Sequence, residues 1–149
     1  FGPETKLPKA SEILSLKGDA KQGKTLIGRC YVCHKIGSAG VEFGPALAGW
    51  GSGQTRDVIL KAILDPSADI SHGFEGTELI VKGDKKIQGF VQAEGDPLVI
   101  RVFGGQDLVI AKEDIQSRKQ VKTSFMAPAS RLGMDAQQLR DVVEYLKLN

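Results

Sequence analysis

The chain of 149 residues has only two cysteines, two methionines and one tryptophan, and what it lacks excludes several classes of protein. Two cysteines are too few for the disulfide framework of small secreted domains. No apolar run is long enough for a transmembrane helix, and no signal-peptide pattern stands at Phe1, so we expect a mature or excised soluble domain. Lys and Arg total 20 against 18 for Asp and Glu, and the formal charge of +2 indicates neither a nucleic-acid binder nor an acidic tail.

The two cysteines stand in one short motif, Cys30-Tyr31-Val32-Cys33-His34. Two thiols three positions apart, with a histidine directly after them, are typical of covalent haem attachment. The two sulfurs add to the two vinyl groups of one porphyrin, and the adjacent imidazole reaches the iron. The motif therefore predicts one haem c, held through Cys30 and Cys33, with His34 as an axial ligand.

Two other kinds of site contain a bare Cys-x-x-Cys pair, namely dithiol oxidoreductases and zinc sites. A structural zinc ion needs four ligands, and beyond Cys30, Cys33 and His34 the chain offers only His72 and carboxylates. A dithiol oxidoreductase places its motif after a strand and at a helix start, whereas this motif ends a helix-like stretch. A non-haem dithiol or zinc protein stays as the less consistent alternative.

Helices are expected on both sides of the motif. Residues 1–17 carry two prolines and a short apolar patch, and they are expected to be a lead-in or linker. Asp19 and Gln22 have the spacing of a capping box, which predicts a helix over residues 20–32. Apolar side chains recur at helical spacing over residues 55–64, which predicts a second helix.

Helical periodicity returns at the end of the chain. Asp135 and Gln138 have the spacing of another capping box, which predicts a last helix from Asp135 onward. Met134 stands directly before this cap and is placed to pack on Leu139 as a hydrophobic staple. Met134 therefore has a structural role.

The intervening residues 74–122 predict a β subdomain. Segments rich in Val, Ile, Leu and Phe alternate with glycine-containing turns, over residues 77–82, 86–93, 98–103 and 107–111. They predict a four-stranded antiparallel meander, to which Ile115 and Val121 are expected to add a turn of helix and a fifth strand. This subdomain either shields the haem or docks the domain onto a larger protein.

An electron-transfer haem needs a ligand opposite His34, and the candidates are Met126, Met134 and His72. Met126 lies in the irregular stretch 124–128, which a proline stiffens, so its thioether can be held against the iron. Met134 belongs to the staple, and His72 precedes the β segments, where an exposed loop histidine is the ordinary case. Met126 is therefore the favoured ligand.

The chain outside the β subdomain resembles the class I cytochromes c. The resemblance is carried by Gly18-Asp19-Ala20, Gly23-Lys24, the motif from Cys30 to His34, Gly44-Pro45-Ala46-Leu47-Ala48-Gly49, Met126 and Tyr145-Leu146. In that family the proline corresponding to Pro45 offers its carbonyl to Nδ1 of the histidine. A glycine such as Gly23 on the first helix permits close contact with the last helix near Tyr145.

The β segments before the methionine make the chain similar to a bacterial haem-binding domain appended to large exported dehydrogenase-like proteins. In that family proline directly follows the methionine, whereas here Ala127 intervenes. The resemblance implies an α+β fold. A mainly α cytochrome c core over residues 18–149 packs its N- and C-terminal helices around the haem, and about four to five antiparallel strands are inserted at residues 74–122.

The function implied is electron transfer by a single haem c, not catalysis, between an exported dehydrogenase or fused domain and a respiratory acceptor. Because bacteria attach haem covalently outside the cytoplasm, a periplasmic or otherwise extracytoplasmic location is expected. The alternative is a haem-based gas sensor or peroxidase-like domain with an open or His72-ligated sixth site.

Other residues are candidate contacts of the haem or of a partner. Trp50 and Arg56 are candidates for holding a haem propionate. The expected apolar walls are Leu26, Ile27, Ile36, Pro45, Leu47, Ile59, Ile63 and Phe125. A basic rim for an acidic partner is a weaker expectation than a solvated face, because the net charge is small. Its residues are Lys21, Lys24, Arg29, Lys35, Arg118, Lys119, Lys122 and Arg131.

Overall fold

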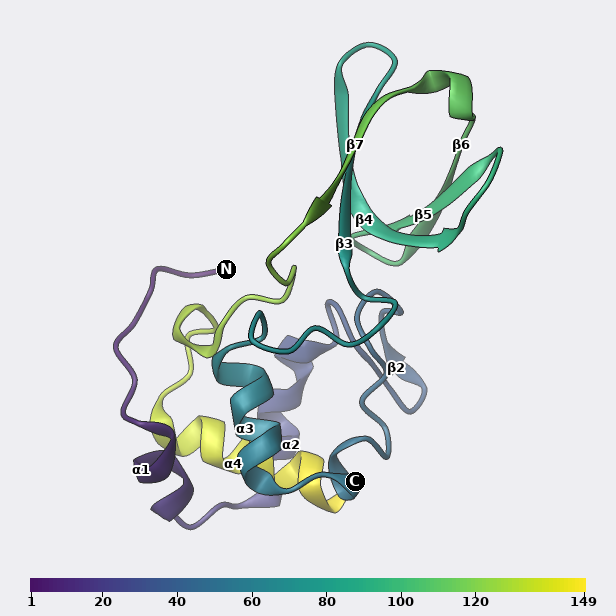
Figure 1. Cartoon of the computed structure of the whole chain (residues 1–149). Helices are drawn as coiled ribbons and strands as arrows, with labels where there is room; N and C mark the ends of the chain where they lie inside the picture. Colours follow the sequence, from purple (N-terminus) through teal and green to yellow (C-terminus); the bar gives the residue numbers. More distant parts are fainter.

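The computed structural model describes residues 1–149 and has two parts that differ in secondary structure (Figure 1). One part consists of helices and loops, and a five-stranded antiparallel sheet projects from it. The chain enters the sheet through β3 (Gly76–Val81) and leaves it through β7 (Ile115–Val121). The residues that join the two parts therefore lie at one end of the sheet.

The expectation of a mainly α fold is wrong. The five-stranded sheet is accompanied by a small sheet of β1 (Lys35–Ile36) and β2 (Ala39–Gly40). All four α-helices are short, namely α1 (Ala10–Ser15), α2 (Ala20–Leu26), α3 (Arg56–Leu64) and α4 (Ala136–Leu148). None of them has the length and hydropathy that crossing a membrane requires.

The largest loss of expected helix lies before the haem-attachment motif. The helix expected over residues 20–32 ends as an α-helix at Leu26 and continues only as a 3-10 turn over Ile27–Cys30. The α-helix continues through Gly23 but ends before Gly28, and glycine disfavours an α-helix by up to about 1 kcal/mol relative to alanine. The prediction of a helix over residues 20–32 did not include the effect of these two glycines.

The larger sheet has the order β6-β5-β4-β3-β7, with every neighbouring pair antiparallel. The strands β4 (Lys85–Ala93), β5 (Leu98–Val102) and β6 (Gln106–Ile110) follow β3 in chain order. A 3-10 turn over Lys112–Asp114 then leads back to β7, which pairs with the other edge of β3. The sheet curls around a core of its own, formed by Leu79, Val81, Ile87, Leu98 and Ile100.

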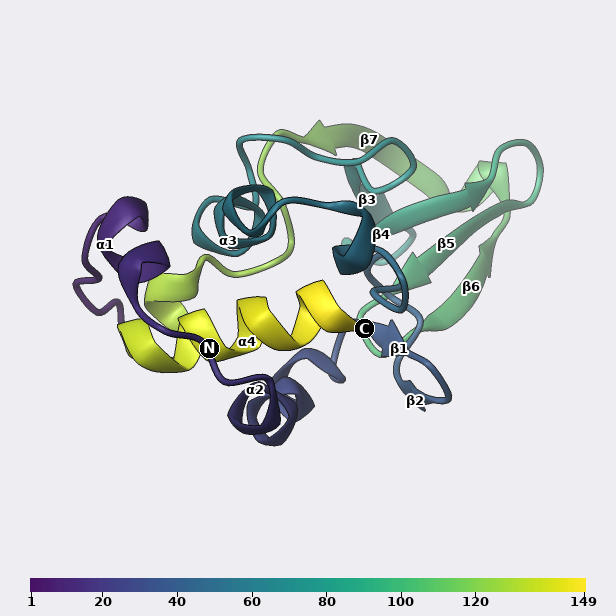
Figure 2. The same cartoon turned by 90° about the horizontal axis from the view of Figure 1, so that it is seen from below.

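A second core holds the helices together, and the crossing of α2 and α4 lies beside it (Figure 2). Gly23 faces α4 so closely that a Cβ there would collide with the carbonyl oxygen of Asp141 and lie 2.7 Å from Cβ of Tyr145. The N–H of Asp19 donates to Oδ1 of Asp141 across the same crossing, at 2.8 Å. The absence of a side chain at Gly23 is therefore what allows the two helices to approach.

The helix caps differ from one another. The carboxylate of Asp19 accepts hydrogen bonds from the N–H groups of Lys21 and Gln22, but the Gln22 side chain does not return the bond, because Asp141 takes the N–H of Asp19. Asp19 is thus an N-cap without a capping box. At α4 the box predicted for Asp135 and Gln138 is confirmed in both directions.

Residues 1–17 contain more structure than a lead-in. Helix α1 lies against α3 and α4, and its Ile13 has no exposed surface. The N–H groups of Gly2 and Thr5 donate to the carbonyls of Arg131 and Ser130. This segment therefore packs on the stretch of chain that follows Met126.

Candidate functional site

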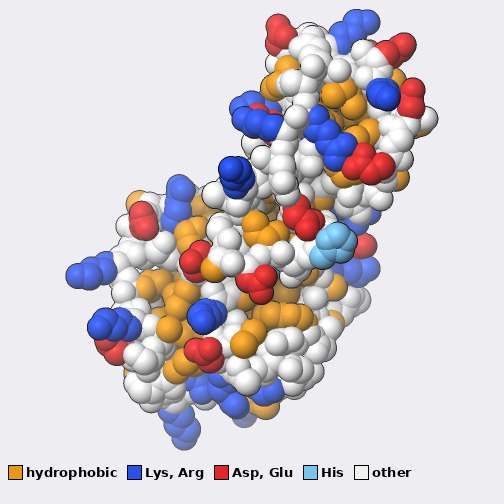
Figure 3. Space-filling view, in the orientation of Figure 1, with side chains coloured by type: hydrophobic (Ala, Val, Ile, Leu, Met, Phe, Trp, Pro, Cys, Tyr) orange, Lys and Arg blue, Asp and Glu red, His pale blue; other side chains and the backbone are white.

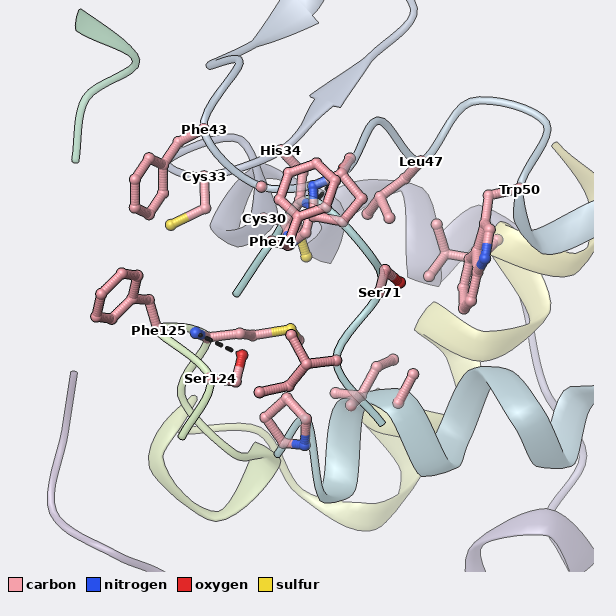
Figure 4. A pocket seen from close by; sticks show the side chains of 18 of the residues that line it. Cys30, Cys33, His34, Phe43, Leu47, Trp50, Ser71, Phe74, Ser124 and Phe125 are labelled. Atoms are coloured by element: carbon pink, nitrogen blue, oxygen red, sulfur yellow. Dashed lines mark hydrogen bonds between the residues drawn. The ribbon is translucent and has the colours of Figure 1, made fainter. Parts of the chain in front are cut away.

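An apolar cavity lies between the helices and the base of the sheet, and it gathers many of the residues selected from the sequence (Figure 4). The space not filled by atoms is about 1110 Å³, part of it open to solvent, and 16 of the 23 lining residues are hydrophobic. Cys30, Cys33 and His34 lie on one side of the cavity, and Ser124 and Phe125 lie opposite them. A concave, mostly apolar lining with a few polar groups is typical of ligand and cofactor sites.

The motif takes its geometry from the turn after α2. The N–H groups of Cys33 and His34 donate to the carbonyl of Cys30, at 3.1 and 2.8 Å. This single turn brings both thiols and the imidazole to the lining of the same cavity. The carbonyl of Cys33 then accepts bonds from the N–H groups of Phe43 and Gly44, so the following loop folds back over the histidine.

His34 is buried, and its ring is fixed by the loop that contains Gly44 and Pro45. Its Nδ1 lies 2.6 Å from the carbonyl oxygen of Pro45, so Nδ1–H donates and Nε2 keeps a free lone pair. A Cβ on Gly44 would lie 2.8 Å from Cε1 of the ring, which explains why a glycine stands there. Burial lowers the pKa of His34, against the opposing effect of the Pro45 bond, and this favours the neutral imidazole that a metal ligand must be.

The two thiols are free and do not resemble a reactive dithiol. Burial, and to a lesser degree the neighbouring Cys33, raises the pKa of Cys30 to about 11, and burial also raises the pKa of Cys33. Redox-active Cys-x-x-Cys pairs instead depress a thiol pKa, commonly at a helix N-terminus. No three side chains of His, Cys, Asp or Glu converge on one point, so the zinc alternative has no ligand set.

Met126 lines the cavity from a loop held by one local and one long-range hydrogen bond. Its N–H donates to Oγ of Ser124 at 3.1 Å, the dashed line in Figure 4. The N–H of Ser124 donates in turn to Oγ of Ser67 at 3.0 Å. These contacts anchor the loop backbone on the segment that follows α3.

The other two candidates for the sixth ligand differ. The side chain of His72 is fully exposed, lies 3.3 Å from Glu75 and does not line the cavity. Met134 does line the cavity, but it is 3% exposed and belongs to the same buried core as Leu139, its expected partner in the staple. Both methionines therefore border the cavity and lie outside the helices, and Met134 is the more deeply buried of the two.

The two candidates for a propionate contact are separated by the structure. Trp50 lines the cavity. Arg56 does not, because its Nε and Nη2 donate to the two carboxylate oxygens of Glu144 at 2.8 and 2.7 Å. The hydrogen bond from Arg56, reinforced by Arg140, holds the pKa of Glu144 at about 2. Arg56 thus stabilises the contact between α3 and α4, a role that its position in the sequence did not indicate.

Half of the expected apolar walls line the cavity. Pro45, Leu47, Ile63 and Phe125 do, whereas Leu26, Ile27, Ile36 and Ile59 do not and pack in or against the helical core. Sequence reasoning missed Phe43, Phe74 and Phe90, which line the cavity from three separate segments. These residues lie far apart in the sequence, so no local motif predicts that they come together. The one shared sequence feature is a glycine directly beside each phenylalanine.

The basic residues do not form one free rim. Arg118 pairs with Glu94 at 2.7 Å, Lys119 pairs with Glu78 at 2.9 Å, and Arg29 donates to backbone carbonyls. Charges of both signs alternate over the face in Figure 3. This pattern is consistent with a solvated surface.

No known protein-family model matches the chain, and no curated protein matches it in sequence. The chemistry of the cavity is therefore interpreted from its own residues.

Proposed function

We propose that the chain carries one haem c bound to Cys30 and Cys33 and transfers electrons, with His34 and Met126 as the axial ligands of the iron. The observation that supports this most is the single apolar cavity that both thiols, the buried imidazole and a methionine on a loop all line. The resemblance to class I cytochromes c rests here on the motif, the Pro45 loop and Met126, and not on helix content.

The residues of the cavity fit such a group. The contact of Nδ1 with the Pro45 carbonyl orients His34 and leaves Nε2 for the iron. The thiols lie one helical turn apart, the spacing that the two vinyl positions of one porphyrin require. When bound, the haem supplies a one-electron couple.

The protein would ligate the iron, exclude water from the haem and bind a propionate. His34 and Met126 would be the protein ligands of the iron, and a thioether ligand would raise the reduction potential relative to a second histidine. The apolar lining excludes water and disfavours added positive charge. Trp50 is the donor best placed to hold a propionate, since Arg56 is engaged by Glu144.

The proposal extends to partners and location. Electrons pass between an exported dehydrogenase, separate or fused to this domain, and a respiratory acceptor. Because covalent attachment of haem takes place outside the bacterial cytoplasm, the domain acts in the periplasm or at another extracytoplasmic site.

Covalent attachment is tested first. The chain is produced together with a haem-attachment system, unfolded and extracted with acidic solvent. We expect the denatured wild type to stay red and Cys30→Ala/Cys33→Ala to lose its colour, since only thioether-bound haem survives extraction. A colourless denatured wild type contradicts the proposed function.

Ligation is tested on the ferric protein. We expect a low-spin spectrum with the weak far-red band of a sulfur-to-iron bond, lost in Met126→Ala and kept in Met134→Ala. A high-spin spectrum that shifts on addition of cyanide contradicts electron transfer and supports a sensor or peroxidase.

A further inference from the structure

Five of the six phenylalanines form one cluster between the cavity and the base of the sheet. The ring of Phe90, on β4, lies at its centre, with its centroid 4.7 Å from Phe43 and 5.3 Å from both Phe74 and Phe125. Phe103, from the turn after β5, packs edge-on against Phe43 at 5.6 Å. The sheet thus contributes directly to the wall of the cavity.

Phe125, the residue directly before Met126, belongs to this cluster. Phe125 packs against both Phe90 and Phe43, whose centroids lie 5.3 and 6.3 Å from its own. Phe90 itself is only 5% exposed, so the ring that supports Phe125 is fixed by its surroundings. The orientation of Phe125 is therefore coupled to the position of β4.

The entry of the sheet contacts the same ring. A Cβ on Gly76 would lie 2.7 Å from Cζ and 2.9 Å from Cε2 of Phe125, well inside the roughly 3.5–4.0 Å of ordinary carbon contacts. Gly76 is the first residue of β3 and pairs with Val121, the last residue of β7. Only residues 122–125 separate that pair from Met126.

We propose that the β sheet positions Met126: Phe90 at its base and Gly76 at its entry hold the ring of Phe125, and so fix the next residue at the cavity. The inference rests on the proposed ligation by Met126. A thioether on an unsupported loop must be ordered each time it binds, whereas a loop that the sheet already holds loses little entropy. Phe90 and Gly76 are thus positioning residues for the ligand.

The test uses Gly76→Ala in the haem-loaded chain, with Gly53→Ala as the matched control. Gly76 does not line the cavity, so its variant reaches the site only through its neighbours. At Gly53 the added methyl group meets no atom within 4 Å. We expect Gly76→Ala to lose most of the far-red band and to bind added imidazole roughly tenfold more tightly, because the released thioether competes less. The control is expected to match the wild type.

A double variant separates positioning from simple destabilisation. Phe125→Leu removes the ring that Phe90 and Gly76 contact, so we expect it to lose most of the band by itself. Because both substitutions act through the same ring, Gly76→Ala/Phe125→Leu should lose no more of the band than either single variant, whereas separate damage to the sheet would add to the loss. If Gly76→Ala fails to fold, Phe90→Leu takes its place, with the same expected loss of band.

Two results overturn the inference. One is a band and imidazole affinity in Gly76→Ala equal to those of the wild type, and the other is a full band in Phe125→Leu. Absence of haem or of the band from the wild type contradicts the proposed function instead. Hydrogen exchange of residues 122–128 needs no haem and still decides the positioning, since faster exchange in Gly76→Ala than in Gly53→Ala supports it and equal exchange refutes it.

Discussion

The substitution Gly23→Ala tests how closely helices α2 and α4 pack against each other. In Gly23→Ala the new Cβ meets the carbonyl oxygen of Asp141 and lies 2.7 Å from both the carbonyl carbon of Asp141 and Cβ of Tyr145. These atoms belong to the backbone and the base of a side chain, so no rotamer change relieves the contact. Helix α2 must move by roughly 1 Å to restore ordinary distances.

The magnitude follows from opposing effects. Overpacking of this kind costs roughly 1–3 kcal/mol, and displacement also weakens the hydrogen bond from Asp19 to Asp141, worth about 1 kcal/mol. Alanine is favoured over glycine in a helix by about 1 kcal/mol, which offsets part of the loss. We expect Gly23→Ala to lower the free energy of unfolding by roughly 1–3 kcal/mol, or the melting temperature by roughly 2–12 °C.

The assay is urea unfolding followed by circular dichroism, with Gly28→Ala as the control. Gly28 lies in the 3-10 turn directly after α2, and a Cβ there meets no atom within 4 Å. The control should be as stable as the wild type or slightly more so. Equal stability of Gly23→Ala and wild type, or equal losses in both variants, would refute the reasoning from the helix crossing.

Two further predictions concern the carboxylate of Glu144 and the methionines. Because the pKa of Glu144 is depressed to about 2, the carboxylate stabilises the fold above its unfolded pKa of 4.5, and this stabilisation is lost as the pH falls towards 2. Arg56 is 41% exposed, which reduces the effect, so Glu144→Gln should cost roughly 2 kcal/mol at pH 7 and almost nothing near pH 2 in urea titrations. Met134→Ala should cost roughly 2–5 kcal/mol without changing the reduction potential, whereas Met126→Ala should lower the potential in a redox titration; the reverse pattern would make Met134 the ligand.

Features that depend on neighbouring residues were predictable from the sequence. The capping box of Asp135 and Gln138 needs only two side chains three positions apart, and it is present as predicted. The contact of His34 with Pro45 followed from the resemblance to a family and is present as well. Both depend on short stretches of chain, so the folding of the rest does not alter them.

Features that depend on distant residues were not predictable. Arg56 is engaged by Glu144 and Gln22 loses its capping bond to Asp141, because each partner lies far along the chain. The mainly α class was wrong because the four α-helices are short and the chain also forms a five-stranded sheet. Phe90 reaches the cavity from a strand that looked remote from it.

The pairing of Gly76 with Val121 has a consequence for how such a protein is altered by evolution or by design. Paired residues on neighbouring strands lie about 5 Å apart, little more than the spacing of consecutive residues. The segment between Gly76 and Val121 can therefore be lengthened or replaced by another without moving its two ends, where it joins the rest of the chain. A replacement segment with an aromatic ring at the position of Phe90 should preserve the contact with Phe125 and the fold of the helical part.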